Sequence, residues 1–406
     1  MLTVFSALDD RARPKGSRDP LGAEAIWSFM GRKIVGNLTT VTGSLDNFMV
    51  ALLCCEFANS ADNDADVQER YLRFEQLSAY LKLCVRPTND GILGITRARA
   101  NFANPPVYLG TAETAQLLAD QASYGLWGLY SSALESAGLI EGEGRRPTAV
   151  GKELIIKIVA SLGDKNWEAL CTLAQRDRLE PTPVARLAPA FCAMLSDEAL
   201  RAVTVEALLA QQKDCRLQCE LFLLMQRYLD EAADGANEPS IEAFCHWLLE
   251  PGVATPDMQA VIGRIRDLDP VLRRADLIMS WLQGKADTSM MDLASTLAPL
   301  LEAIAPDASW SDLGDLPYRK FLEEFHEACV QGDADAVIRA VLAQNKRVMT
   351  ARGGAAWLEA DAGHSLVVRV RNDRSSDLDA LGTNAGPWRY TYFIGSFLAI
   401  CRQGRA

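Results

Sequence analysis

The sequence predicts a mainly α-helical protein: an irregular helical bundle with a winged-helix-like module in its N-terminal half and a small C-terminal β-hairpin. Three observations support this prediction. Most of the 406 residues lie in stretches rich in Ala, Leu, Glu, Asp and Arg, which favour helix over strand. Residues 111–161 follow the order of helix, Gly/Trp/Tyr-rich helix, charged hairpin and helix. In residues 364–371 polar and apolar side chains alternate and several are β-branched, a pattern that is typical of a strand.

Residues 1–106 are expected to form an N-terminal helical domain with a basic arm. The arm contains the cations Arg11, Arg13, Lys15 and Arg18. Apolar periodicity predicts three helices, over residues 21–35, 44–57 and 66–85. Ser44 is the expected N-cap of the second helix, because its hydroxyl can accept a hydrogen bond from a first-turn amide. The segment 91–106 is less regular.

Residues 107–162 have the pattern of a winged helix-turn-helix. The second helix of such a motif enters the major groove and needs side chains that reach bases or phosphates. Here that helix, about 123–137, contains no Lys or Arg, and its aromatic residues are Tyr124, Trp127 and Tyr130. We interpret these three as candidate protein contacts. The alternative is DNA binding through the wing, for which the candidate contacts are Arg145, Arg146 and Lys152.

The rest of the chain is expected to form a helical bundle over 163–345, followed by a hairpin and a closing helix over 346–406. Alternation places Arg369 and Arg371 on one face of the hairpin strand. We interpret this as a solvated face. The alternative is an anion site, to which Arg352 would contribute because the adjacent Gly353 and Gly354 let backbone amides approach.

No catalytic motif is present. The chain has three histidines, and it lacks a nucleophile elbow, a P-loop and a dinucleotide-binding glycine motif. Cys215 and Cys219 lie on one helix face, but the second pair, Cys245 and His246, is adjacent, which is poor ligand geometry. We therefore expect core cysteines, no metal, no cofactor and no enzymatic activity. An enzyme without a recognisable motif remains a further alternative.

Charge and cysteine use restrict the class of protein further. The formal net charge is −12, so the chain repels DNA on average and bulk electrostatic binding to phosphates is excluded. Ten cysteines occur at irregular positions within apolar helical patterns. The first ten residues lack a basic region followed by a long apolar run. We therefore expect a reduced, cytoplasmic protein that does not interact with membranes.

Two sequence blocks resemble uncharacterised bacterial proteins of multi-gene anti-phage defence loci. The first block is Ser17-Arg18-Asp19-Pro20-Leu21-Gly22 with 37–42, and the second is 124–130 with Gly138-Leu139-Ile140. The likeness covers about the first 160 residues and defines no catalytic residue. It implies a non-catalytic subunit that binds partner proteins encoded nearby, of the helicase, nuclease or ATPase class. Contact with DNA would then go through such a partner. The alternative is a DNA-binding or regulatory protein that uses Arg145, Arg146 and the basic termini.

Overall fold

The computed structural model confirms that the protein is mainly helical. It describes residues 19–60, 66–86, 91–210, 215–233, 240–301, 310, 312–372 and 388–405. Within these ranges the strands form three small antiparallel sheets of two strands each. No helix within them is long and apolar enough to cross a membrane. The basic arm lies outside the described residues.

The chain divides into two compact units. Unit 1 comprises Met1–Gly31 and Cys245–Tyr392, and unit 2 comprises Arg32–Phe244 and Phe393–Ala406. The boundaries expected after residues 106 and 162 fall inside unit 2. There, strand β1 (Val107–Tyr108) pairs with strand β4 (Arg178–Leu179), so segments from both sides of the second boundary belong to one structure.

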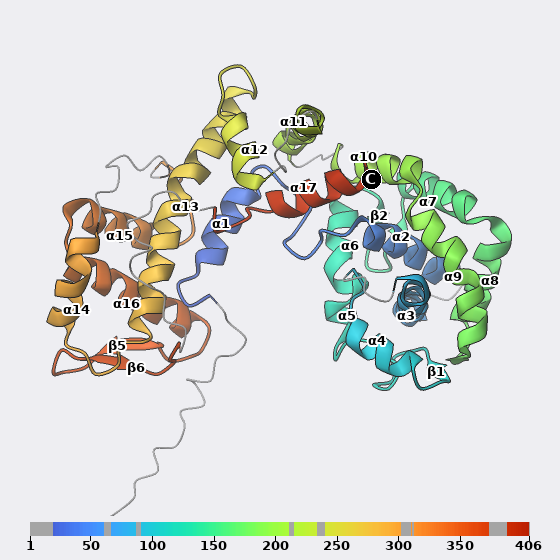
Figure 1. The fold of residues 1–406 in the computed structure, drawn as a ribbon, viewed down its shortest axis with the longest axis horizontal. Coiled ribbons are helices and arrows are strands. Elements are labelled where there is room, and N and C mark those ends of the chain that lie inside the picture. Colours follow the sequence, from blue (N-terminus) through green and yellow to red (C-terminus); the bar gives the residue numbers. More distant parts are fainter. Residues whose placement is uncertain are drawn as a thin grey trace, which may run out of the picture. The chain divides into compact units, whose positions relative to one another are not determined.

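Unit 2 is built around helix α3 (Val67–Val85), which Figure 1 shows surrounded by other helices. The unit also contains α2 (Leu45–Asn59), α4 (Ile95–Phe102), α5 (Gln121–Tyr124), α6 (Leu126–Ser136), β2 (Ile140–Glu141), β3 (Arg146–Pro147), α7 (Ala149–Leu162), α8 (Asp164–Ala174), α9 (Pro181–Leu195), α10 (Glu198–Leu209), α11 (Arg216–Ala233) and α17 (Ile394–Gln403). Helix α12 (Ile241–Leu248) spans the boundary between the units. The segment 91–106, expected to be irregular, contains α4.

The central position of α3 follows from its sequence. Apolar and aromatic side chains occur on more than one side of this helix, and a helix that is apolar around its circumference becomes buried. Its fully buried apolar and aromatic side chains are those of Tyr71, Phe74, Leu77, Tyr80 and Leu81. Helices α2 and α9 make the most extensive contacts with it. Four polar residues of α3 are buried among these apolar side chains: Glu75, Gln76, Ser78 and Lys82.

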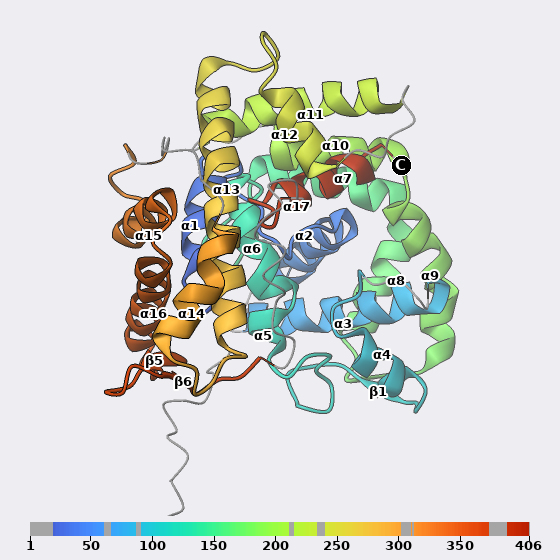
Figure 2. The same cartoon turned by 60° about the vertical axis from the view of Figure 1, so that its left-hand side comes forward.

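Unit 1 is assembled around the long helix α13 (Pro256–Leu282). Its other elements are α1 (Ala23–Gly31), α14 (Met290–Leu297), the 3₁₀ turn Ala298–Leu300, α15 (Arg319–Gln331), α16 (Ala334–Ala351), β5 (Leu358–Ala360) and β6 (Leu366–Val368). Helices α15 and α16 pack against each other, and β5 and β6 lie at one end of α16 (Figure 2). Asn345 of α16 donates to the carbonyl of Pro20, which holds the start of the described chain against this helix.

The N-terminal ends of α2 and α7 are capped in different ways. Helix α2 begins at Leu45 as expected, but the Ser44 hydroxyl makes no capping hydrogen bond. The Leu45 amide donates instead to the side chain of Gln403, at 2.9 Å. Helix α7 has a local cap, because the Thr148 hydroxyl accepts from the Gly151 amide at 3.1 Å. A distant side chain has thus replaced a local cap at α2.

Candidate functional site

The hairpin between α6 and α7 is short and firmly held. Strand β2 pairs antiparallel with β3, with Glu141 opposite Arg146. The turn between them, residues 142–145, contains two residues in the left-handed region, Gly142 at φ +70° and Arg145 at φ +53°. The Asn59 side chain at the end of α2 donates to the carbonyls of Gly144 and Arg145, at 3.1 and 3.4 Å. The hairpin is therefore fixed to α2 before any partner binds.

Arg145 faces the protein. Its guanidinium lies over the Trp127 ring, 4.8 Å from the centroid, and it donates to the carbonyls of Gly142 and Glu143. Arg145 was a candidate phosphate contact at the tip of a wing. The phosphate contact stays a prediction, and in the structure this side chain lies against Trp127.

Trp127 forms one wall of a cavity beside the hairpin. Its ring packs edge-on against buried Tyr71, with 5.1 Å between centroids, and the side chain remains half-buried. The cavity has a volume of about 700 Å³. Its lining residues are Val67, Gln68, Trp127, Glu141, Gly142, Glu143, Gly144 and Arg146. We call this the Trp127 cavity.

The described lining of the Trp127 cavity carries charged groups around one aromatic ring. It offers an aromatic wall, exposed Glu141 and Glu143 on the hairpin, and a cation, Arg146. Trp and Arg are the residue types that most often dominate binding energy at protein interfaces.

Glu75 of α3 contacts α6, the helix that carries Trp127. This carboxylate is buried and accepts a hydrogen bond from the Leu126 amide at 2.9 Å, so it caps the first turn of α6. Gly125 is required beside it, because a Cβ there would overlap a carboxylate oxygen of Glu75. Burial raises the pKa of Glu75 to about 7, although the bond from Leu126 opposes the shift.

Replacing Glu75 with glutamine is expected to remove a pH dependence of stability. The folded-state pKa of about 7 exceeds the ordinary value of 4.5, so the stabilising contribution is complete below about pH 4.5 and is lost as pH rises through 7. The shift corresponds to roughly 3 kcal/mol. At pH 8 the variant should therefore be more stable than wild type by an amount of this order, and the difference should shrink towards pH 5.

Urea unfolding between pH 5 and 8 measures this effect. Lys82, seven residues further along α3, is also buried, which lowers its pKa to about 8. It is common to both proteins, so its contribution largely cancels in the comparison. Glu69→Gln is the matched control, since this carboxylate is partly exposed and pairs with Arg73. If the free energy of unfolding changed with pH in the same way for wild type and Glu75→Gln, a raised pKa of Glu75 would be contradicted.

The other candidate residues of this module fall in different environments. Tyr124 is 64% exposed, whereas Tyr130 is 1% exposed and its hydroxyl accepts a hydrogen bond from Asn47. Tyr130 is thus a core residue, because it lies on the face of α6 that packs on α2, and its assignment as a partner contact is corrected. Arg146 and Lys152 are both exposed.

The C-terminal candidates lie in unit 1 and take part in internal ion pairs. Arg352 pairs with Asp19 at 3.5 Å and donates to its carbonyl at 2.6 Å. Arg369 pairs with Glu359 on the neighbouring strand at 2.6 Å. Arg371 is exposed and, like Arg369, follows the end of β6, so the expected strand is shorter than the alternating sequence. Arg352 and Arg369 are thus partly occupied by structural contacts.

The cysteine candidates have core contacts. The Cys215 thiol lies near the carbonyls of Arg32 and Lys33, at 3.9 and 3.5 Å from the sulfur, and burial raises its pKa. Cys245 is fully buried. A raised pKa keeps a thiol protonated and weakens it as a metal ligand or nucleophile.

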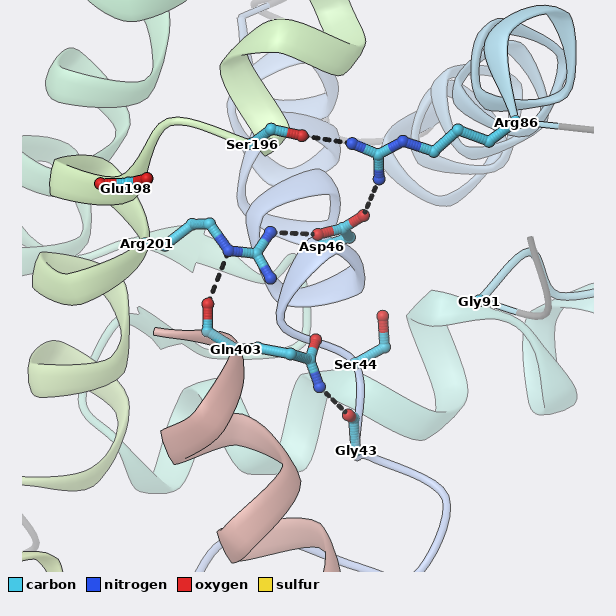
Figure 3. Close-up of a pocket in the computed structure, with 9 residues that line it drawn as sticks. All are labelled: Gly43, Ser44, Asp46, Arg86, Gly91, Ser196, Glu198, Arg201 and Gln403. Atoms are coloured by element: carbon cyan, nitrogen blue, oxygen red, sulfur yellow. Dashed lines mark hydrogen bonds and ion pairs between the residues drawn. The ribbon is translucent and has the colours of Figure 1, made fainter. Parts of the chain in front are cut away.

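A second cavity of unit 2, of about 520 Å³, contains an ionic network that the sequence analysis missed (Figure 3). Asp46 of α2 bridges two guanidinium groups, accepting from Arg201 at 2.7 Å and from Arg86 at 3.1 Å. Arg86 also donates to Ser196, and Arg201 donates to the Gln403 carbonyl at 2.6 Å. These contacts join α2, α3, α10 and α17, so we assign the network to stability.

Comparisons with models of known protein families, with curated proteins and with solved structures found no match for this chain.

Proposed function

We propose that this protein is a non-catalytic subunit that binds partner proteins, and that the Trp127 cavity is its principal contact. The observation that carries the proposal is a half-buried tryptophan beside a hairpin that Asn59 and Arg145 hold in place. A preformed hairpin loses little conformational entropy when it binds, which favours affinity. Following the resemblance of the first 160 residues, we propose bacterial anti-phage defence as the setting and proteins encoded nearby as the partners.

The order of α6, β2, β3 and α7 supports a winged-helix-like arrangement for this module. Its charges favour protein over DNA as the ligand. The exposed positions of α6 include Gly128, Ser132 and Glu135, and none of its residues is a cation. Glu141 and Glu143 on the hairpin would repel phosphates, and Arg145 is turned inward. DNA binding through Arg146 and Lys152 is the outcome that would replace this proposal.

Co-expression with the proteins encoded by neighbouring genes tests the proposal. We expect Trp127→Ala and Glu143→Arg to weaken retention of a partner at least about tenfold, because the first removes the aromatic wall and the second reverses a charge at the cavity. Trp127→Phe should retain part of the binding. Glu198→Arg is the matched control, an exposed glutamate at the other cavity, and should behave like wild type.

Two results would contradict the proposal. One is a complex that assembles equally well with Trp127→Ala and Glu143→Arg. The other is tight binding of the isolated chain to short duplex DNA that falls steeply with salt and is lost in an Arg146→Glu, Lys152→Glu variant, as expected of a protein that neutralises several phosphates.

A further inference from the structure

The second cavity of unit 2 contains a buried cation with an unused donor. The side chain of Arg201 is 9% exposed and lines this cavity. Its Nε donates to the Gln403 carbonyl, and its Nη1 donates to Asp46 and to the Leu195 carbonyl. Its third nitrogen, Nη2, has no hydrogen-bond partner among the described residues (Figure 3). The ionic network therefore leaves the N–H groups of this nitrogen available for another acceptor.

The N-terminal end of α2 borders the same cavity. Ser44 precedes this helix and lines the cavity, but its hydroxyl caps no first-turn amide and has no partner within the described ranges. The Leu45 amide is held by the Gln403 side chain at 2.9 Å. Helix α2 is 15 residues long, and the start of such a helix carries partial positive charge and amide donors that attract anions.

Two guanidinium groups at the cavity share one carboxylate. Asp46 accepts from Arg201 at 2.7 Å and from Arg86 at 3.1 Å. Glu198 is the other carboxylate in the described lining; it is exposed and takes no part in the network (Figure 3). The formal charge of the whole chain is −12, so this gathering of cations opposes the general trend.

Lys82 adds a third positive charge near Asp46. It is buried on α3, and its ammonium donates to two neutral oxygens, the Asn47 side chain at 2.9 Å and the Gly91 carbonyl at 3.4 Å. Burial lowers the pKa of Lys82 to about 8, and the charge of Asp46 opposes the shift. Three cations therefore adjoin one buried carboxylate. Buried charge is costly unless it is paired, so an anion in the cavity would stabilise the group.

We propose that this cavity binds a small ligand through a phosphate group, which lies at the N-terminal end of α2. The Nη2 of Arg201, the Ser44 hydroxyl and first-turn amides of α2 donate to its oxygens. A phosphate group offers three acceptor oxygens in different directions, which suits donors from three sources better than a planar carboxylate does.

The size of the cavity fits a ligand larger than free phosphate. Its volume of about 520 Å³ lies in the range of roughly 300–1,000 Å³ that is usual for small-molecule sites. A metabolite that carries a phosphate group could therefore occupy it. The proposal is independent of the proposed protein contact, because the two cavities share no lining residue.

The decisive variant is Ser44→Asp. Aspartate is a good N-cap residue, so α2 should keep its start, while the new carboxylate occupies the phosphate position and repels the ligand. Thr255→Asp is the matched control, because Thr255 is the exposed N-cap of α13 and accepts from the Met258 amide at 3.4 Å. Arg201→Lys keeps the charge but removes the guanidinium fork. Circular dichroism shows which variants fold, and Ser44→Asp decides if Arg201→Lys does not.

Isothermal titration calorimetry of the full-length chain measures binding, in a buffer free of phosphate and sulfate. The probes are inorganic phosphate and ribose 5-phosphate, which distinguish a free ion from a phosphorylated metabolite. We expect wild type and Thr255→Asp to bind at least one probe equally well. Ser44→Asp and Arg201→Lys should bind it at least about tenfold more weakly. The bound probe should raise the Tm of wild type and leave that of Ser44→Asp unchanged.

Three results would overturn the proposal. The first is a folded wild-type chain that binds neither probe. The second is equal binding by wild type and Ser44→Asp, because the phosphate would then bind elsewhere. The third is acetate that binds wild type as tightly as either probe and is lost in Ser44→Asp, because the site would then select a carboxylate.

Discussion

Replacing Asp46 with alanine is expected to lower the free energy of unfolding by about 3–5 kcal/mol, the typical cost of removing one partner from a buried ion pair. The side chain of Arg201 is 9% exposed and that of Asp46 11% exposed, so the guanidinium would remain buried without its carboxylate. Arg86 would lose the same partner. Urea denaturation monitored by circular dichroism measures the loss.

Arg178→Ala provides the comparison for Asp46→Ala. Arg178 and Glu180 form an exposed ion pair at 3.7 Å, with side chains 68% and 58% exposed. Exposed pairs typically contribute about 0–1 kcal/mol, so this variant should unfold almost like wild type. If Asp46→Ala were as mild as Arg178→Ala, the network would not be holding α2, α10 and α17 together.

Replacing Gly151 with alanine is expected to destabilise the protein by about 3 kcal/mol, towards the upper end of the usual range for overpacking. Gly151 lies in the first turn of α7, and a Cβ there would overlap the Leu139 carbonyl oxygen. That oxygen also accepts from the Thr148 amide at 3.0 Å, so it cannot move without disturbing the junction between the hairpin and α7. The midpoint and slope of urea unfolding give the loss.

Gly263→Ala is the matched control for Gly151→Ala. Gly263 also lies in a helix, α13, but no atom lies within 4 Å of the place where its Cβ would be. Alanine has the higher helix propensity, so this variant should gain up to about 1 kcal/mol. A stabilising effect of alanine at both positions would show that α7 does not pack closely on Leu139.

The sequence predicted the helices well where a local pattern determines them. Helix α2 begins one residue after the expected Ser44 cap, and α3 occupies 67–85 within the expected 66–85. Periodicity of apolar residues and breaks at Gly, Pro and Asp are local signals, so both can be read without knowing the fold.

The Trp127 cavity was only partly predictable from sequence. Trp127 was a candidate protein contact because of its place in the aromatic helix, and the structure finds it half-buried beside the cavity. The inward turn of Arg145 depends on Asn59, which lies 86 residues away, and on a left-handed backbone. No periodicity contains such information.

The burial of Glu75 could have been predicted from the sequence. It shares one face of α3 with buried Tyr71 and Lys82, at helical spacings of four and seven residues. A charged residue on an apolar face indicates a buried group with a specific partner. The identity of that partner, the Leu126 amide, follows from tertiary packing alone.

Hydrogen exchange of the purified complex against the free chain tests most directly whether the Trp127 cavity is the principal partner contact. Residues 140–147 form the hairpin, and the backbone amides of all of them except Pro147 should exchange more slowly once a partner covers the cavity. We expect this protection in complexes of wild type and Glu198→Arg, and its loss with Glu143→Arg. A stable complex in which residues 140–147 exchange as in the free chain would contradict the account.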